Sequence, residues 1–189
     1  MTRPPALAPS SDPDATGAAG WTADEAVTRL FATHYRPMVR LAALLLRDAS
    51  QAEELVQDAF VALHGRWTRL RDPERAVAYL RQSVVNAARS ALRHRGVVDR
   101  FLGRQPAPGT GPSADVGVLE AETRAEVLAA VRNLPARQRE ALVLRYYADL
   151  SEAQTAETMG VSAGSVKSHT ARALAALRLS LGRTLGPLS

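Results

Sequence analysis

The last acidic residue of the chain is Glu157, and every charged side chain after it is basic. These later charged residues are Lys167, Arg172, Arg178 and Arg183. A helix that carries cations and small hydrogen-bonding side chains, but no carboxylate to repel phosphate, is suited to the major groove of DNA. The residue types therefore indicate a DNA-binding element near the C-terminus, although two packed helices with a basic outer face would give the same pattern.

A helix-turn-helix is predicted to position these side chains. Ser151 and Gln154 have the spacing of a capping box, so a first helix is predicted from there to about Met159. Gly160 can adopt the positive φ that ends a helix, and Ser162 can cap the next one. In that next helix, apolar side chains share one stripe and small or polar side chains lie opposite. The residues predicted to contact DNA are Ser165, Lys167, Ser168, His169 and Arg172.

A second candidate surface is acidic and lies in the N-terminal half. Apolar residues recur at i, i+4, i+7 and i+11 from Val56 to Trp67, which predicts a helix with a buried stripe. Trp67 is interpreted as core, the alternative being a stacking surface for a base. Outside the stripe lie Glu53, Glu54, Gln57 and Asp58. Such a face could bind a partner by charge complementarity, although a solvated helix face would give the same pattern.

The segment between Arg66 and Arg104 is basic, in contrast to the acidic face before it, because arginine far outnumbers the acidic residues there. One face of a predicted helix combines amides and a tyrosine with arginines, and this mixture suits bases and phosphates together. A solvated basic face is the plainer alternative. The loop before this helix adds three more arginines. The residues predicted to contact DNA here are Arg69, Arg71, Arg75, Tyr79, Gln82, Asn86, Arg89 and Arg93.

Helical periodicity fills two segments of the chain and strand-like alternation fills none, so the predicted fold class is all-α. We predict two small helical domains, residues 21–98 and 119–183. Residues 99–118, rich in Gly and Pro, are predicted to be a flexible linker. Residues 1–20 are predicted to be a disordered tail and residues 184–189 a short C-terminal tail.

The composition points away from several classes of function. The chain has 189 residues, a formal net charge of +5 and a sequence pI of about 10.4, which favours a polyanionic partner. The absence of cysteine excludes disulfides, thiolate metal sites and cysteine nucleophiles. The four histidines are scattered, and neither a phosphate-binding loop nor a nucleophile elbow is present. We therefore predict no catalytic residues, no metal site, no cofactor and no enzyme activity.

Nothing in the sequence predicts insertion into a membrane. Arginine interrupts every apolar run before it reaches the length of a span, and the N-terminus lacks the apolar core of a signal peptide. A cytoplasmic protein is therefore expected. Lys167 is the only lysine among 24 basic residues, and Ala, Gly and Pro are abundant. This usage is typical of a GC-rich genome, such as that of an actinobacterium.

The C-terminal segment resembles region 4 of bacterial sigma factors, and specifically of the small extracytoplasmic-function (ECF) group. This chain departs from the family pattern at four positions that bear on the preferred DNA sequence: Thr155, His169, Thr170 and Ala171. The matching motifs are Leu134-Pro135, Arg137-Gln138-Arg139, Leu144-Arg145-Tyr146, Leu150-Ser151, Ala156-Glu157, Met159-Gly160-Val161-Ser162 and Gly164-Ser165-Val166-Lys167-Ser168.

The N-terminal half resembles region 2 of the same group. The face with Glu54 and Asp58 is similar to the family residues that grip the clamp helices of RNA polymerase. The stretch from Ala76 to Arg95 is similar to the part that meets the −10 element, and the loop before it to one that captures a flipped base. The resemblance implies a sigma factor that directs promoter-specific initiation. Its partners would be the β′ clamp helices and β flap of core polymerase, promoter DNA with −10 and −35 elements, and an anti-sigma factor.

Three other classes of protein could use some of the same motifs. A response regulator would need an N-terminal α/β receiver domain, for which the sequence has no pattern. A purely protein-binding adaptor would not account for basic faces on both domains. A stand-alone helix-turn-helix regulator, dimerising through its N-terminal domain, would bind DNA without core polymerase and is the alternative kept open.

Overall fold

The computed structural model describes residues 20–46, 48–70, 72–102 and 118–184. The elements in this part of the chain are helical, which confirms the predicted all-α class. The predicted tails and linker fall largely outside the described residues. The helices are α1 (Ala23–Leu46), α2 (Ala49–Arg66), α3 (Ala76–Leu102), α4 (Val118–Asn133), α5 (Ala136–Leu142), α6 (Glu152–Met159) and α7 (Ala163–Thr184), with 3₁₀ turns at Trp67–Arg69 and Pro73–Arg75 and a π-helical turn at Val143–Tyr147.

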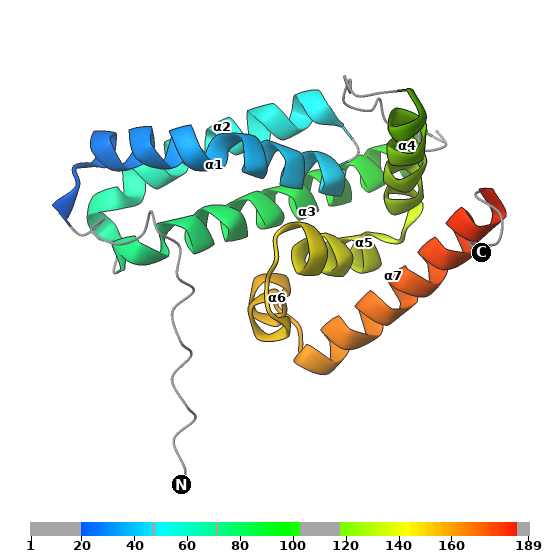
Figure 1. Ribbon diagram of the computed structural model, residues 1–189. Coiled ribbons are helices and arrows are strands. Elements are labelled where there is room, and N and C mark those ends of the chain that lie inside the picture. The colour runs from blue at the N-terminus through cyan, green and yellow to red at the C-terminus, as the bar shows by residue number, and fades with distance from the viewer. Residues whose placement is uncertain (1–19, 47, 71, 103–117, 185–189) are drawn as a thin grey trace, which may run out of the picture.

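Helices α1, α2 and α3 form an N-terminal bundle in which the chain runs from left to right along α1, back along α2 and from left to right again along α3 (Figure 1). The apolar stripe predicted from Val56 to Trp67 is buried, together with Leu41 of α1 and Leu80 of α3. The indole Nε1 of Trp67 donates to the carbonyl of Trp21 at 2.9 Å, which ties the end of α2 to the start of α1. Trp67 is therefore a core residue, as predicted, and offers no stacking surface.

The start of α2 is fixed by an acidic cap. The Asp48 carboxylate accepts the Gln51 backbone N–H at 3.2 Å and pairs with Arg95 of α3 at 3.2 Å. The backbone hydrogen bond, followed by Arg95, holds the pKa of Asp48 below its ordinary value. A carboxylate at this position satisfies a helix N–H and interacts favourably with the helix dipole. The cap thus fixes the orientation of the helix that carries the acidic face.

Helices α4 to α7 form the C-terminal domain, in which α7 packs against α4, α5 and α6. The predicted capping box is complete: the Gln154 N–H donates to Ser151 Oγ at 3.2 Å, and the Ser151 N–H donates to Gln154 Oε1 at 2.8 Å. Gly160 ends α6 with φ +64°. Ser162 Oγ accepts the Ser165 N–H at 3.2 Å and so caps α7. The predicted helix-turn-helix is confirmed.

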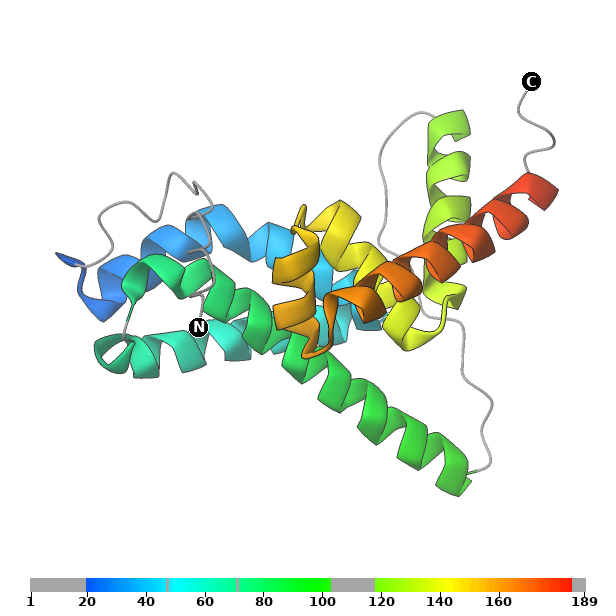
Figure 2. The ribbon, with the colours of Figure 1, turned by 90° about the horizontal axis from the view of Figure 1, so that it is seen from below.

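The two domains pack against each other, which the sequence did not predict. Helices α5 and α6 lie across the middle of α3, as the views from the side and from below both show (Figures 1 and 2). Helix α1 also contacts α4, α5 and the π-helical turn. In that turn the Tyr147 hydroxyl donates to the Pro37 carbonyl at 3.4 Å, and burial raises the pKa of this tyrosine.

Candidate functional site

The acidic face consists of Glu53, Glu54, Gln57 and Asp58 on α2, and all four side chains are exposed. Gln57 contacts α1, because its Nε2 donates to Tyr35 Oη at 3.4 Å. The carboxylates therefore point into solvent with the sign and spacing that the sequence predicts. They are available to a basic partner surface.

An apolar groove adjoins the acidic face. It lies between α1 and α2, has a volume of about 450 Å³, and is flanked by Phe31 and Val61, which are 42% and 71% exposed. Phe31 stacks on Tyr35 at a centroid distance of 4.3 Å and meets Phe60 edge-on at 5.2 Å. These ring contacts hold the groove wall in place. An apolar centre bordered by carboxylates is typical of a surface that binds a protein.

The basic surface of α3 divides into an open part and a covered part. Arg69, Arg75 and Arg93 are exposed, and Arg75 pairs with Asp72 at 3.0 Å. Tyr79 is half-buried, with the Arg66 guanidinium 5.8 Å from its ring centroid. Arg71, also predicted to contact DNA, lies outside the described residues.

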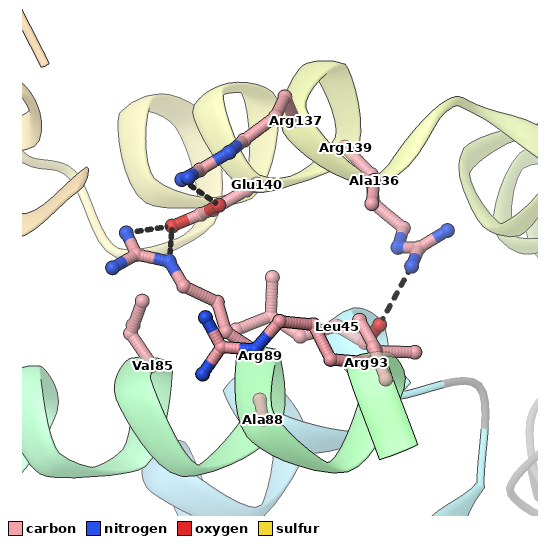
Figure 3. A pocket seen from close by; sticks show the side chains of 10 residues that line it. Leu45, Val85, Ala88, Arg89, Arg93, Ala136, Arg137, Arg139 and Glu140 are labelled. Atoms are coloured by element: carbon pink, nitrogen blue, oxygen red, sulfur yellow. Dashed lines mark hydrogen bonds and ion pairs between the residues drawn. The ribbon is translucent and has the colours of Figure 1, made fainter. Parts of the chain in front are cut away.

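The middle of this surface is bonded to the C-terminal domain. Gln82 Nε2 and Arg89 Nη2 both donate to the Thr158 carbonyl, each at 3.0 Å. Arg89 Nε donates to Glu140 Oε1 at 2.8 Å, and Arg89 Nη2 donates to the same oxygen (Figure 3). Asn86 Oδ1 accepts from both Gln82 and Arg89, at 3.1 Å and 3.0 Å. The structure therefore brings these three predicted DNA-binding residues together, but as part of a contact between domains.

Helix α7 presents the third surface. Lys167, Ser168 and Arg172 are exposed, while Ser165 and His169 are half-buried. The stripe on the opposite side is buried at Val166 and Ala173, which are 1% and 0% exposed. The face predicted to enter a major groove is therefore open to solvent, with Arg172 and Lys167 as its cations.

The sequence reasoning missed two charged residues of α5. Arg139 and Glu140 are only 2% and 4% exposed. Arg139 donates to the carbonyls of Arg132 and Leu134 at 3.1 Å, and to the carbonyl of Leu45 in α1 at 2.9 Å. The sequence did contain a signal for their burial. The residues three and four positions after each of them are apolar, and in a helix these residues lie on the same face as Arg139 and Glu140.

The described residues hold no group of three or more acidic or histidine side chains that could bind a metal ion. Within the same residues, none of the helices combines the length and the apolar character needed to cross a membrane.

Comparison with known proteins gives the same division into two regions. The family model described as sigma-70 region 2 matches residues 30–97, and the one described as sigma-70 region 4 matches residues 124–177. The RNA polymerase sigma-E factor of Streptomyces coelicolor is 34% identical over 146 residues, which cover 77% of this chain and 80% of that protein. The ECF RNA polymerase sigma factor SigM of Mycobacterium tuberculosis is 35% identical over 162 residues, covering 83% and 78%.

Two solved structures share the fold. The sigma factor RpoE from Bartonella quintana, solved with the anti-sigma factor NepR, has a TM-score of 0.71 and 23% identity over 82% of this chain and 95% of that one. CnrH, solved with the cytosolic domain of CnrY, has a TM-score of 0.63 and 24% identity over 90% and 95%. At these identities the likeness supports the arrangement of helices alone.

Proposed function

Because this chain belongs to the ECF group of the sigma-70 family of RNA polymerase sigma factors, we propose that its three surfaces divide the steps of promoter-specific initiation among them. The observation that carries the proposal is that regions 2 and 4 occur in family order in one chain, and that each region has its own charged surface. A stand-alone regulator would need no acidic face beside an apolar groove and no region 2. That alternative is not favoured.

The acidic face and the adjoining groove are the proposed contact with core polymerase. Glu54 and Asp58 would meet basic side chains of the β′ clamp helices, and Val61 would supply the apolar centre of the interface. Carboxylates around an apolar centre combine rapid, steered association with a desolvated core. The C-terminal domain would contact the flap of the β subunit.

The exposed arginines around α3 are the proposed contact with the −10 element. Opening a duplex costs about a few kcal/mol for each base that leaves the stack. A basic groove with a ring beside it recovers part of this cost by holding the separated strand. Arg69, Arg75 and Arg93 would hold phosphates, and Gln82, Asn86 and Arg89 would reach bases and phosphates once the C-terminal domain has moved away.

Helix α7 is the proposed reader of the −35 element. We expect Arg172 and Ser168, at the centre of the exposed face, to contact base edges, and Lys167 at its flank to contact phosphate. Arg172→Ala should change the selected −35 sequence, at a cost of about 1–3 kcal/mol at its base pair. Lys167→Ala should weaken all sequences alike and flatten the salt dependence.

The measurement is selection from a promoter library randomised at −35, performed with holoenzyme. Lys167→Ala is the matched control, since it removes one cation from the same helix. Identical selected motifs for wild type and Arg172→Ala would show that Arg172 does not read sequence.

Two DNA contacts on one chain reinforce each other, because each raises the effective concentration of the second. The proposed role needs no catalytic group of the chain itself and places the protein in the cytoplasm beside polymerase and DNA.

Two fold relatives were solved with partner proteins: RpoE with the anti-sigma factor NepR, and CnrH with the cytosolic domain of CnrY. We therefore expect an anti-sigma factor that covers the same surfaces.

Run-off transcription tests the proposal. Core polymerase, core polymerase with this protein, and this protein alone would each be supplied with a library of genomic promoter fragments. New transcripts with defined start sites are expected only when core polymerase and the protein are combined. DNA binding without any new transcript would favour the stand-alone regulator instead.

A further inference from the structure

A pocket of about 340 Å³ lies between α5 and α3, and the proposed function gives it no role (Figure 3). Its floor is apolar: Leu45 of α1 and Val85 and Ala88 of α3 line it and are buried. The volume falls within the range of about 300–1,000 Å³ that is typical of small-molecule sites. Among the described residues that line the pocket none is aromatic, so the floor suits an aliphatic group rather than a stacked ring.

The rest of the lining is cationic. Four arginines line the pocket: Arg89, Arg93, Arg137 and Arg139. Glu140 is the acidic residue of the lining, and it accepts from both Arg89, at 2.8 Å, and Arg137, at 3.2 Å. Arg93 donates at 3.0 Å to the hydroxyl of Ser90, which is neutral. The pocket therefore keeps positive charge that its own carboxylate does not neutralise.

The charged and apolar parts of the pocket lie at different depths. Arg93 on α3 and Arg137 on α5 are exposed, whereas the floor residues are buried. A guanidinium presents paired N–H donors that match a carboxylate or a phosphate. A molecule that satisfies both parts has an anionic head near solvent and an aliphatic tail pointing inward. A DNA strand carries no aliphatic chain, so the contact proposed for the −10 element does not account for the apolar floor.

We propose that this pocket binds a small organic anion with an aliphatic tail, such as the anion of a medium-chain fatty acid. The inference goes beyond the proposed function, because such binding needs neither polymerase nor promoter DNA. The tail would lie against the floor, and the head would bind the exposed guanidinium groups of Arg93 and Arg137.

Calorimetric titration of the full chain with decanoate, at fixed pH and salt, tests the proposal. We expect a Kd of about 10–100 μM, the range of a well-placed ligand of this size. Each methylene removed from the tail, as in nonanoate and octanoate, should weaken binding roughly fourfold, because it buries less apolar surface. An affinity that does not depend on the length of the tail would overturn the proposal.

The head group is tested with the same tail. Decanol, which is uncharged, should bind at least about tenfold more weakly than decanoate, because it forms no charge-assisted hydrogen bond with the arginines. Decyl phosphate carries the other anion that a guanidinium matches. Binding of either anion supports the site, and the tighter of the two identifies the head group. Equal binding of decanol and decanoate would show that the arginines recognise no ligand here.

Two charge variants locate the head. Arg93→Met and Arg137→Met each keep an apolar stem and remove a guanidinium from an exposed position, so each should bind decanoate roughly tenfold more weakly. Arg178→Met is the matched control, since Arg178 is an exposed arginine of α7 that does not line the pocket. The control should bind decanoate as the unchanged chain does. Equal losses in all three variants would mean that net charge alone attracts the anion, and would refute the site.

Filling the pocket tests the position of the tail. Ala136 lines the pocket and is exposed, so Ala136→Trp adds volume there without repacking the core. We expect it to weaken decanoate binding at least about tenfold. Ala153→Trp, at an exposed position of α6 outside the lining, is the control and should bind normally. Undiminished binding by a folded Ala136→Trp would place the ligand elsewhere and overturn the inference; if that variant does not fold, the series of tails and heads on the unchanged chain still decides it.

Discussion

Replacing Glu54 and Asp58 together by lysine is expected to weaken binding of the protein to core polymerase by roughly 100-fold or more. Both carboxylates are exposed on α2, and within the part of the chain that the structure describes neither makes a hydrogen bond or ion pair that the fold requires. Reversal converts attraction into repulsion at an interface where close charge pairs contribute about 1.5–7 kcal/mol. The measurement is a fluorescence titration of labelled protein with core polymerase. Helical content should be unchanged, because both positions are solvent-exposed.

The control for this pair is Glu152→Lys with Glu157→Lys. Both control residues are exposed acids of α6, and the total change of charge is identical. The control variant should retain core affinity within a few-fold, which would assign the loss to the acidic face rather than to net charge. Core affinity equal to wild type in the Glu54→Lys/Asp58→Lys variant would remove the acidic face from the polymerase contact.

The sequence predicted those parts of the structure that depend on neighbours within one or two helical turns. The spacing from Val56 to Trp67 predicted a buried stripe because a helix repeats its faces every three to four residues. Ser151, Gln154 and Gly160 predicted the ends of α6 because caps satisfy local backbone groups. The exposed faces of α2 and α7 followed from the same periodicity. The whole helix-turn-helix was therefore available from local rules.

Contacts between the domains were not available from such rules. Arg89 and Glu140 are 51 residues apart, and nothing in the local pattern of either helix indicates that they meet. The covered state of Gln82 and Arg89 was missed for the same reason: a polar helix face looks identical whether it meets water, DNA or another domain. Periodicity identifies which residues share a face, but tertiary packing decides what that face contacts.

The segment from Ala136 to Tyr147 shows a second limit. Two arginines and a glutamate in its first turns suggest a solvent-exposed helix, since these residues are seldom fully buried. In the structure α5 packs at the contact between the two domains and continues into a π-helical turn. The turn ends near Asp149, a non-glycine residue with φ +50°. A backbone of this kind is held by surrounding contacts, so residue preference alone does not indicate it.

Arg139 has the largest expected effect on stability, because one buried guanidinium completes the ends of two helices. Its acceptors are the carbonyls of Leu45, in the last turn of α1, and of Arg132 and Leu134, at the end of α4. The last carbonyls of a helix have no partner within it, and the helix dipole makes them negative. A cation placed between two such ends satisfies both requirements. Its side chain also lines the pocket between the domains, together with Leu45 and Val85.

Arg139→Met keeps the stem and removes every donor, so it isolates the role of the guanidinium. Leaving buried carbonyls unsatisfied costs about 1–3 kcal/mol each, and we expect a loss of at least about 3 kcal/mol in the free energy of unfolding. Urea denaturation followed by circular dichroism measures it. Arg137→Met is the matched control. The Arg137 side chain is 51% exposed and pairs with Glu140 at 3.2 Å, so a loss of less than about 1 kcal/mol is expected. Arg139→Lys should recover part of the loss, since an ammonium retains the charge but not the planar fork that reaches both helix ends. Equal stability of Arg139→Met and Arg137→Met would mean that water satisfies these carbonyls and that Arg139 does not join the two domains.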